Sequence, residues 1–376
     1  MERKTWVEIS KSALRANALK LKKMFGKNVR VLIVVKGNGY GAGIKALVTT
    51  TRSIVDWYGV DSLDEANKVR EFCQNPVLIL GYVSVRDAAE MVSKNFSCVI
   101  YDYRLAAALS KRATKKNPAK VHIKVDSGLI RLGLFPAAAI ALAKKIAQLP
   151  NVAIEGLCTH YAWLIDDDGD KIYPAQLEKF NGVVKTLAAS GIKPELLHTA
   201  SSVAAFLFPE TRFNMVRIGI PLHGLWGRPS TVELINKNLA DNALRPIMAW
   251  KTKVVNVKKI SANTSVGYGR SETVSKETTV AILGAGFYDG IDKRYGKTGS
   301  VLINGKKAKM LGSISMNMCA VDASGVKNVK IGDEAVLIGR SGREEITAYD
   351  VAGLIETSTY EVISRINPLL PRIIVR

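Results

Sequence analysis

The feature that most constrains the fold is an alternation of short apolar segments with longer Ala-, Leu- and Lys-rich segments over roughly the first 220 residues. The apolar segments have the length and composition of buried strands. Four intervening segments, 63–72, 104–114, 136–148 and 175–189, are helical in character. This alternation predicts a parallel sheet, and eight repeats predict an α/β fold, a (β/α)8 barrel of the TIM type. An open doubly wound sheet is the main rival. The apolar segments are 31–35, 54–60, 77–80, 98–101, 121–125, 152–158, 196–198 and 215–218.

The alternation stops after Gly224. Segments 227–230 (GRPS) and 245–246 (RP) flank a polar stretch that indicates a domain junction, so we place the barrel at 1–240 and a second domain at 241–376. One helix is expected at 347–356, and a last strand at 371–376. The remaining short strand segments predict a C-terminal, mainly β domain. They are 248–260, 279–283, 300–303, 309–313 and 334–338.

A single lysine ends the first predicted strand. Segment 36–43 reads KGNGYGAG, so Lys36 precedes glycines that let the backbone turn sharply and approach a ligand closely. Lysine is rarely buried without a partner, so its place at the end of a buried strand is unusual. An amine shielded from water can form a Schiff base with an aldehyde. The alternative is a lysine that points into solvent beside a tight turn.

Polar residues also follow the later strands, at the end where barrel enzymes hold their functional groups. Tyr40 follows the first strand, Arg131 the fifth and His160 the sixth. Taken alone, each could be structural: His160 could be a satisfied core histidine, and Arg131 could form a surface ion pair. Their joint placement favours a site at one mouth of the barrel.

The segments after strands seven and eight indicate a phosphate site. Ser201 and Ser202 offer hydroxyls and amides at an expected helix start, and Gly219-Ile220 offers backbone amides with no side chain at Gly219. The lysine of the first strand faces these groups across the barrel. An aldehyde for the lysine and a phosphate for the amides together describe pyridoxal 5′-phosphate.

The motifs resemble those of the alanine racemases, which are fold type III pyridoxal phosphate enzymes. The resemblance covers essentially the whole chain, with the motifs in the same order across two domains. It implies an N-terminal barrel, a C-terminal β domain and a head-to-tail homodimer. It also implies that a strand within residues 1–10 joins the sheet of the β domain. The motifs are VKGNGYG (35–41), HIKVDSG and RLG (122–133), HTA (198–200), NMVRIGI (214–220), GYG (267–269), GSISM (312–316), YEV (360–362) and PR (371–372).

The resemblance also implies roles for single residues. Lys36 would bind the cofactor and act as one base, while Tyr268 of a second subunit would act as the base on the opposite face of the substrate. Arg131 would contact the cofactor's phenolic oxygen and the substrate carboxylate, and Arg217 the pyridine nitrogen. Met316 of the second subunit would contact the substrate. The phosphate would be held by Tyr40, Ser202, Gly219, Ile220 and Tyr360, with His160 nearby.

Other positions carry weaker signals. Lys124 matches a lysine that is carbamylated in some members of the family. Gly37 and Gly39 stand where alanine is usual, which should loosen the lysine loop. Without the resemblance, Tyr268 would be interpreted as a packed aromatic residue of the β domain and Met316 as a core methionine.

Departures from the family pattern bear on substrate range. Ala42, Ile130 and Asn317 replace a usual histidine, glycine and aspartate, which affects pocket size and substrate access, but no catalytic group is missing. The sequence therefore predicts a pyridoxal phosphate-dependent racemase that interconverts L- and D-alanine and supplies D-alanine for peptidoglycan. A racemase of wider range, including serine or lysine, is the first alternative, and a non-catalytic pyridoxal phosphate carrier is the second.

The overall composition of the chain restricts which partners and which cellular location we expect. The formal net charge of +21 could reflect a nucleic-acid partner, but the basic clusters lack interleaved aromatic residues and no nucleic-acid motif is present, so a solvated surface is favoured. Four dispersed cysteines form no CxxC pair, and no metal site is expected. The charged N-terminus lacks an apolar signal region, and no apolar run is long enough to span a membrane. We therefore expect a cytoplasmic protein.

Overall fold

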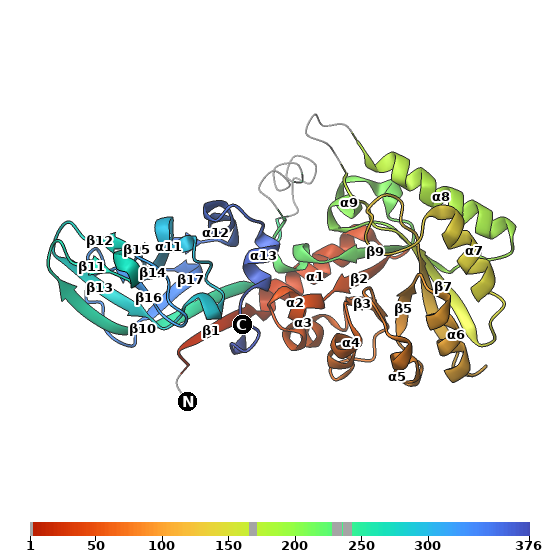
Figure 1. Ribbon diagram of the computed structural model, residues 1–376, viewed down its shortest axis with the longest axis horizontal. Coiled ribbons are helices and arrows are strands. Elements are labelled where there is room, and N and C mark those ends of the chain that lie inside the picture. Colours follow the sequence, from red (N-terminus) through yellow and green to blue (C-terminus); the bar gives the residue numbers. More distant parts are fainter. Residues whose placement is uncertain (1–2, 165–170, 228–234, 236–242) are drawn as a thin grey trace.

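Two large sheets organise the chain, one in each half of an elongated molecule (Figure 1). The computed structural model describes residues 3–164, 171–227, 235 and 243–376. The predicted boundary between residues 240 and 241, and most of the predicted junction at 227–230, lie outside the described residues.

The first sheet has eight parallel strands in the order β8-β7-β6-β5-β4-β3-β2-β9. Strand β9 returns beside β2, and the Arg217 N–H donates to the Ala200 carbonyl just past β8 at 3.3 Å, which nearly closes the sheet. This sequential order differs from that of a doubly wound sheet, so the barrel prediction is confirmed. The strands are β2 (Arg30–Val34), β3 (Trp57–Val60), β4 (Val77–Ile79), β5 (Ser97–Ile100), β6 (Ala119–Lys124), β7 (Val152–Cys158), β8 (Leu196–His198) and β9 (Met215–Ile218).

Helices surround this barrel, and their ends follow local sequence signals. Ser10 caps the first helix by accepting the Ala13 N–H, and Ser62 and Asp102 cap α4 and α6 in the same way. The helix at 44–51 is an addition to the sequence prediction. The helices are α1 (Lys11–Phe25), α2 (Lys36–Tyr40), α3 (Ile44–Thr51), α4 (Leu63–Arg70), α5 (Ala88–Ser93), α6 (Tyr103–Arg112), α7 (Pro136–Ile146), α8 (Tyr173–Ala189) and α9 (Ser202–Leu207), with 3₁₀ turns η1 (Val85–Asp87), η2 (Pro209–Thr211) and η3 (Ile220–His223).

The barrel interior is apolar on one side and polar on the other. Alternate residues of a strand point to opposite faces, so one set points inward. Strands β2 to β5 contribute apolar side chains such as Leu32, Trp57 and Leu78. Strands β6, β8 and β9 contribute His122, His198 and Arg217, which are all buried. The polar side therefore needs hydrogen-bond partners inside the barrel.

The second sheet has nine strands in the order β18-β17-β14-β15-β16-β13-β10-β1-β19. Strand β1 (Thr5–Ser10) pairs antiparallel with β10 and parallel with β19, so the N-terminal segment lies in this sheet. The remaining elements are β10 (Met248–Ile260), β11 (Ser265–Val266), β12 (Glu272–Thr273), β13 (Thr278–Leu283), β14 (Ser300–Ile303), β15 (Lys306–Leu311), β16 (Cys319–Asp322), β17 (Glu334–Ser341), β18 (Glu344–Ile346), β19 (Arg372–Val375), α11 (Tyr295–Thr298), α12 (Ala348–Leu354), α13 (Thr359–Ser364), η4 (Tyr268–Arg270) and η5 (Phe287–Asp289). The predicted C-terminal, mainly β domain is confirmed.

Candidate active site

A cavity of about 530 Å³ opens at the carboxyl ends of the barrel strands. Its apolar lining includes Val34 and Val99, which point inward from β2 and β5, and Leu80, which follows β4. This volume lies within the range typical of small-molecule sites. Of the residues predicted for the site, eight line this one cavity: Lys36, Tyr40, Arg131, His160, Ser202, Arg217, Gly219 and Tyr360.

The lysine lies at the start of a left-handed turn. Gly37, Asn38 and Gly39 have φ values of 61°, 51° and 64°, and Tyr40 follows at 51°. Glycine and asparagine tolerate this region best, so the glycines fit the turn without steric strain. The Lys36 side chain is 43% exposed, with Nζ 3.9 Å from an Asp61 carboxylate oxygen. Lys36 therefore enters the cavity, and in the single chain its side chain is partly exposed to solvent.

Hydroxyl groups gather on one wall of the cavity. The Gly219 N–H donates to Ser202 Oγ at 3.1 Å, and a Cβ at Gly219 would lie 2.5 Å from the Tyr40 hydroxyl oxygen. The absence of a side chain at Gly219 thus leaves room for Tyr40. Burial raises the pKa of Tyr40 and raises the pKa of Tyr360 to about 12, so both phenols stay protonated and can donate hydrogen bonds.

Arg131 lies in a loop, residues 126–131, that hydrogen bonds to the Asp126 carboxylate stabilise. The Asp126 carboxylate accepts backbone N–H groups from residues 128–131 at 2.9 to 3.2 Å. Burial acts to raise the pKa of Asp126, but these hydrogen bonds outweigh it and lower the pKa. The Arg131 guanidinium has no hydrogen bond or ion pair with any described residue. It is therefore available to an anionic group in the cavity.

Arg217 is held much more tightly. Its Nη1 donates to Nδ1 and the carbonyl of His198 at 2.6 and 2.8 Å, and its Nη2 donates to the Thr159 and Thr199 carbonyls at 2.7 and 2.9 Å. Nη2 also lies 3.2 Å from His160 Nδ1. Nε has no hydrogen bond to a described residue, although the side chain lines the cavity. The fixed guanidinium therefore has one donor for a ligand.

Lys124 is a cavity residue whose amine has no hydrogen bond or ion pair with any described residue. Burial chiefly lowers its pKa to about 8, and Arg217 and Arg131 add to the effect while Cys158 opposes it. The pKa of His160 is also lowered well below its usual value, first by burial and then by Arg217. The mouth of the barrel is thus strongly cationic, which suits an anionic ligand.

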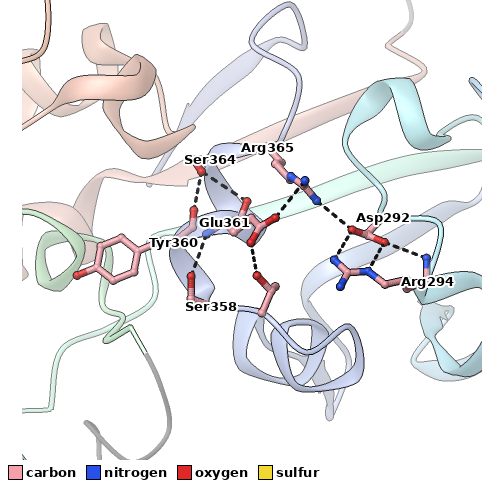
Figure 2. A network of polar contacts seen from close by, with 8 residues as sticks. Asp292, Arg294, Ser358, Tyr360, Glu361, Ser364 and Arg365 are labelled. Carbon is pink, nitrogen blue, oxygen red and sulfur yellow. Dashed lines mark hydrogen bonds and ion pairs between the residues drawn. The ribbon is translucent and has the colours of Figure 1, made fainter. Parts of the chain in front are cut away.

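Helix α13 brings Tyr360 from the second half of the chain to the cavity (Figure 2). On its other side Arg365 bridges Glu361, at 3.1 Å, and Asp292, at 3.0 Å. Asp292 also pairs with Arg294 at 2.8 Å, and this arginine chiefly lowers the pKa of Asp292 to about 2. These ion pairs link the helix that carries Tyr360 to the β-domain segment that contains Asp292 and Arg294.

Three predicted residues are placed elsewhere. Ile220 is completely buried beside Gly219 and is not among the residues that line the cavity. Tyr268 and Met316 lie in the β domain, 79% and 58% exposed, and neither lines the cavity of its own chain. Strands β11 and β12, which flank η4 and Tyr268, lie at the end of the molecule away from the barrel (Figure 1). Sequence reasoning missed Asp61, whose place after β3 follows the same strand-end rule.

The fold and cavity place the chain among barrel enzymes, and the comparisons with known proteins narrow the class to racemases. Models of the alanine racemase N-terminal and C-terminal domains match residues 9–226 and 247–374. The alanine racemase of Symbiobacterium thermophilum is 36% identical over 98% of this chain and 97% of its own, and that of Methanococcus maripaludis 33% over 98% of both. The alanine racemase structure from Bacillus anthracis with bound L-Ala-P superposes with a TM-score of 0.91 at 29% identity, covering 100% of this chain and 96% of that one.

The chain belongs to the alanine racemase family, and it is an isomerase of the racemase type. No helix in the part of the chain that the structure describes is long and apolar enough to cross a membrane.

Proposed function

We propose that this chain interconverts L- and D-alanine with pyridoxal 5′-phosphate bound at the barrel mouth. One observation carries the proposal: the Lys36 amine enters the same cavity as the Tyr40 and Tyr360 phenols and the Arg131 guanidinium, which has no partner among the described residues. Family membership supports it, as does the bound L-Ala-P of the solved relative.

The residues present fit the cofactor. Three hydroxyls, from Tyr40, Ser202 and Tyr360, would hold the phosphate, with Gly219 leaving room and the neighbouring Ile220 supplying a backbone amide. Lys36 would hold the aldehyde carbon covalently. When bound, pyridoxal phosphate supplies an electron sink that acidifies the Cα proton of an amino acid.

The remaining cavity residues would then orient the substrate and move its proton. Arg131 would bind the substrate carboxylate, since its guanidinium has no partner among the described residues. Arg217 would direct its Nε–H at the pyridine nitrogen, and His160 would lie beside it. Because arginine stays protonated, this contact would keep that nitrogen unprotonated. The Lys36 amine would remove or return the Cα proton on one face.

A second copy of the chain would supply the other base. Racemisation needs groups on both faces of Cα, and Tyr268 does not line the cavity of its own chain. The Tyr268 carbonyl accepts the Ser313 hydroxyl at 3.4 Å, which links η4 to the segment that leads to Met316. Both side chains are exposed, as are three other large apolar side chains beside Met316. Met318 follows it in sequence, and the Phe287 and Tyr288 N–H groups donate to the Ser315 and Met316 carbonyls. Such exposure suits a homodimer interface that carries Tyr268 to the neighbour's Lys36.

The first alternative is a racemase of broader range that also accepts serine or lysine. Ile130, which replaces a usual glycine beside Arg131, is 71% exposed, whereas Ala42 is fully buried and is not among the cavity residues. Rates with a panel of L-amino acids would decide between the two. We also propose a cytoplasmic role in supplying D-alanine for peptidoglycan, which a D-alanine requirement on loss of the gene would support.

The direct test is a D-amino-acid assay with L-alanine. We expect Lys36→Ala to abolish activity and Tyr268→Phe to lower it by roughly 10² to 10⁴-fold, the usual share of one acid–base group. Tyr103→Phe, an exposed tyrosine on the barrel helix α6, is the matched control and should keep full activity. Activity that survives Lys36→Ala would refute the proposal, and full activity of Tyr268→Phe would refute the two-base assignment.

A further inference from the structure

A chain of hydrogen bonds runs through the barrel core from Arg217 to a carboxylate. His198 Nδ1 lies 2.6 Å from Arg217 Nη1, and His198 Nε2 lies 2.8 Å from His122 Nδ1. His122 Nε2 lies 3.1 Å from Glu155 Oε2, which also accepts the Ser97 hydroxyl at 2.6 Å. The four charged or imidazole groups come from β6, β7, β8 and β9, which are neighbours in the barrel.

The two ends of this chain fix every proton in it. Arginine only donates, so His198 Nδ1 must accept and the His198 proton must be on Nε2. That proton points to His122 Nδ1, so the His122 proton must also be on Nε2, where the Glu155 carboxylate accepts it. Both imidazoles are therefore neutral, with one positive charge at Arg217 and one negative charge at Glu155.

The backbone of strands β6 and β7 allows His122 and Glu155 to meet. A Cβ at Gly156 would lie 2.2 Å from His122 Nδ1, so only glycine leaves room for the imidazole ring there. The register between β6 and β7 shifts at this point, since Val121 pairs with Ile154 but His122 pairs with Gly156. Glu155 is the extra residue of this bulge, and a bulge re-aims side chains.

The electrostatics agree with a neutral His198 between the two charges. Burial lowers the pKa of His198 well below its usual value, and the neighbouring Arg217 adds to the effect. Burial acts to raise the pKa of Glu155, but the hydrogen bonds from His122 and Ser97 outweigh it and lower the pKa. A buried arginine is costly without a counter-charge, and the ordered chain connects Arg217 to one.

We propose that Glu155 and His122 are positioning residues, which act through His198 to orient Arg217 so that its Nε–H points into the cofactor cavity. The inference rests on the proposed function, since it takes Arg217 as the cofactor contact. Glu155 itself reaches a separate cavity of about 150 Å³, which it lines with Ser97, Lys120 and Trp57. The chain of hydrogen bonds therefore connects two separate cavities, with Arg217 in one and Glu155 in the other.

Nitrogen-15 NMR of the full-length, histidine-labelled protein tests the proton order. The chain has only four histidines, and His223, whose ring nitrogens have no partner among the described residues, serves as a reference outside the network. We expect His122 and His198 to be neutral with the proton on Nε2 at neutral pH. A proton on Nδ1 of either residue would overturn the proposal.

Two substitutions of Glu155 distinguish the loss of its hydrogen-bond acceptor from a change in side-chain size. Glu155→Leu removes the acceptor and should change the His122 ring signals. It should also weaken pyridoxal phosphate binding by roughly tenfold, by analogy with the loss of metal affinity when the carboxylate behind a metal-ligating histidine is removed. Glu155→Gln keeps an acceptor oxygen and should retain the tautomers and most of the affinity. The KM for alanine should stay within about twofold in both, because Arg131 holds the substrate.

A third variant covers the case in which Glu155→Leu does not fold. Gly156→Ala removes no polar group but displaces the His122 ring, so it should disturb the same two histidine signals and lower cofactor affinity. Unchanged His122 and His198 signals in Gly156→Ala and Glu155→Leu would refute the positioning role. The spectra can be recorded whether or not the protein is active. If the histidine protons are ordered as proposed but the protein has no racemase activity, the proposed function fails while the proton order stands.

Discussion

The barrel mouth and the tip of the β domain present their functional groups in opposite ways. At the mouth, Arg217 has its four terminal N–H groups engaged and is only 6% exposed. At the tip, the Tyr268 side chain is 79% exposed and no described residue bonds its hydroxyl. One region is organised within a single chain, whereas the other has the exposed apolar character of a surface that meets a partner. Under the proposed function, this contrast would make cofactor binding and completion of the catalytic pair separate properties.

The sharpest test of this contrast is complementation between two inactive variants. In a mixed dimer of Lys36→Ala and Tyr268→Phe, one of the two sites has an intact Lys36 from one chain and an intact Tyr268 from the other. Random mixing makes half the dimers mixed, so about a quarter of the wild-type activity should return. The measurement is the alanine assay after the two proteins are unfolded together and refolded.

The control is the same mixture without exchange of subunits, which should stay as inactive as each variant. If co-refolded mixtures regain no activity while refolded wild type does, Tyr268 does not act across a dimer. The exposure of the tip would then need another explanation.

A large stability effect is expected at Lys124. Its folded pKa of about 8 lies below the unfolded value of 10.5, so the unfolded chain binds more protons between these pH values. Stability should therefore rise from pH 8 to about 10.5, and the cost of the buried ammonium should be fully present below pH 8. Lys124→Met should be more stable than wild type at pH 7 by on the order of 1 to 3 kcal/mol. Urea unfolding of cofactor-free protein at both pH values measures this.

The matched control is Lys120→Met, on the same strand, for which no such gain at pH 7 is expected. The lowered pKa has a chemical consequence as well. Near pH 8 about half of the Lys124 amines would be neutral, and a neutral amine adds CO₂ to form a carbamate with loss of a proton. Carbon-13 bicarbonate should give a carbamate signal in wild type, and its persistence in Lys124→Met would assign it to another lysine.

The sequence was informative where local pattern decides the structure. The eight barrel strands follow from periodicity, and the strand-end rule predicted that Lys36, Arg131 and His160 would lie at one mouth of the barrel, where all three line the same cavity. Short elements such as β16 and the helix α3 were missed, because so few residues do not show a clear helical or strand periodicity in hydrophobicity.

Other features depend on contacts that no local pattern records. The link from Glu155 to His122 requires a one-residue bulge in β7, and sequence alone does not reveal strand register. The resemblance alone nominated Tyr268, because its proposed role depends on a second chain. The sequence also left open whether Lys36 is shielded from water, because it does not show how open the barrel mouth is in one chain.

A smaller effect is expected where the two regions meet, at helix α13. Tyr360→Phe removes one donor to the phosphate and should weaken cofactor binding by about tenfold, since a hydrogen bond to a charged group contributes roughly 1.5 kcal/mol. Arg365→Ala removes only the exposed ion pairs to Glu361 and Asp292 and should weaken binding by no more than about fivefold. Arg340→Ala breaks a comparable surface pair with Glu345 on the β17–β18 hairpin and should have no effect. Equal losses in Tyr360→Phe and Arg365→Ala would mean that the ion pairs determine the position of the helix.

The smallest effect is expected at Ile130, in the loop that presents Arg131. Its φ of 55° is costly for a β-branched residue, by on the order of 1 to 3 kcal/mol, and the exposed side chain gains little from packing in return. Ile130→Gly relieves the strain but increases the entropy of the unfolded chain, so the net gain should be about 1 kcal/mol, or a few degrees in Tm. Ile130→Asn, which tolerates the same φ with less entropy cost, should gain as much or more. If both variants lose stability, the Ile130 side chain must make a contact that one chain does not contain, which would extend the partner surface from the tip of the β domain to the rim of the barrel mouth.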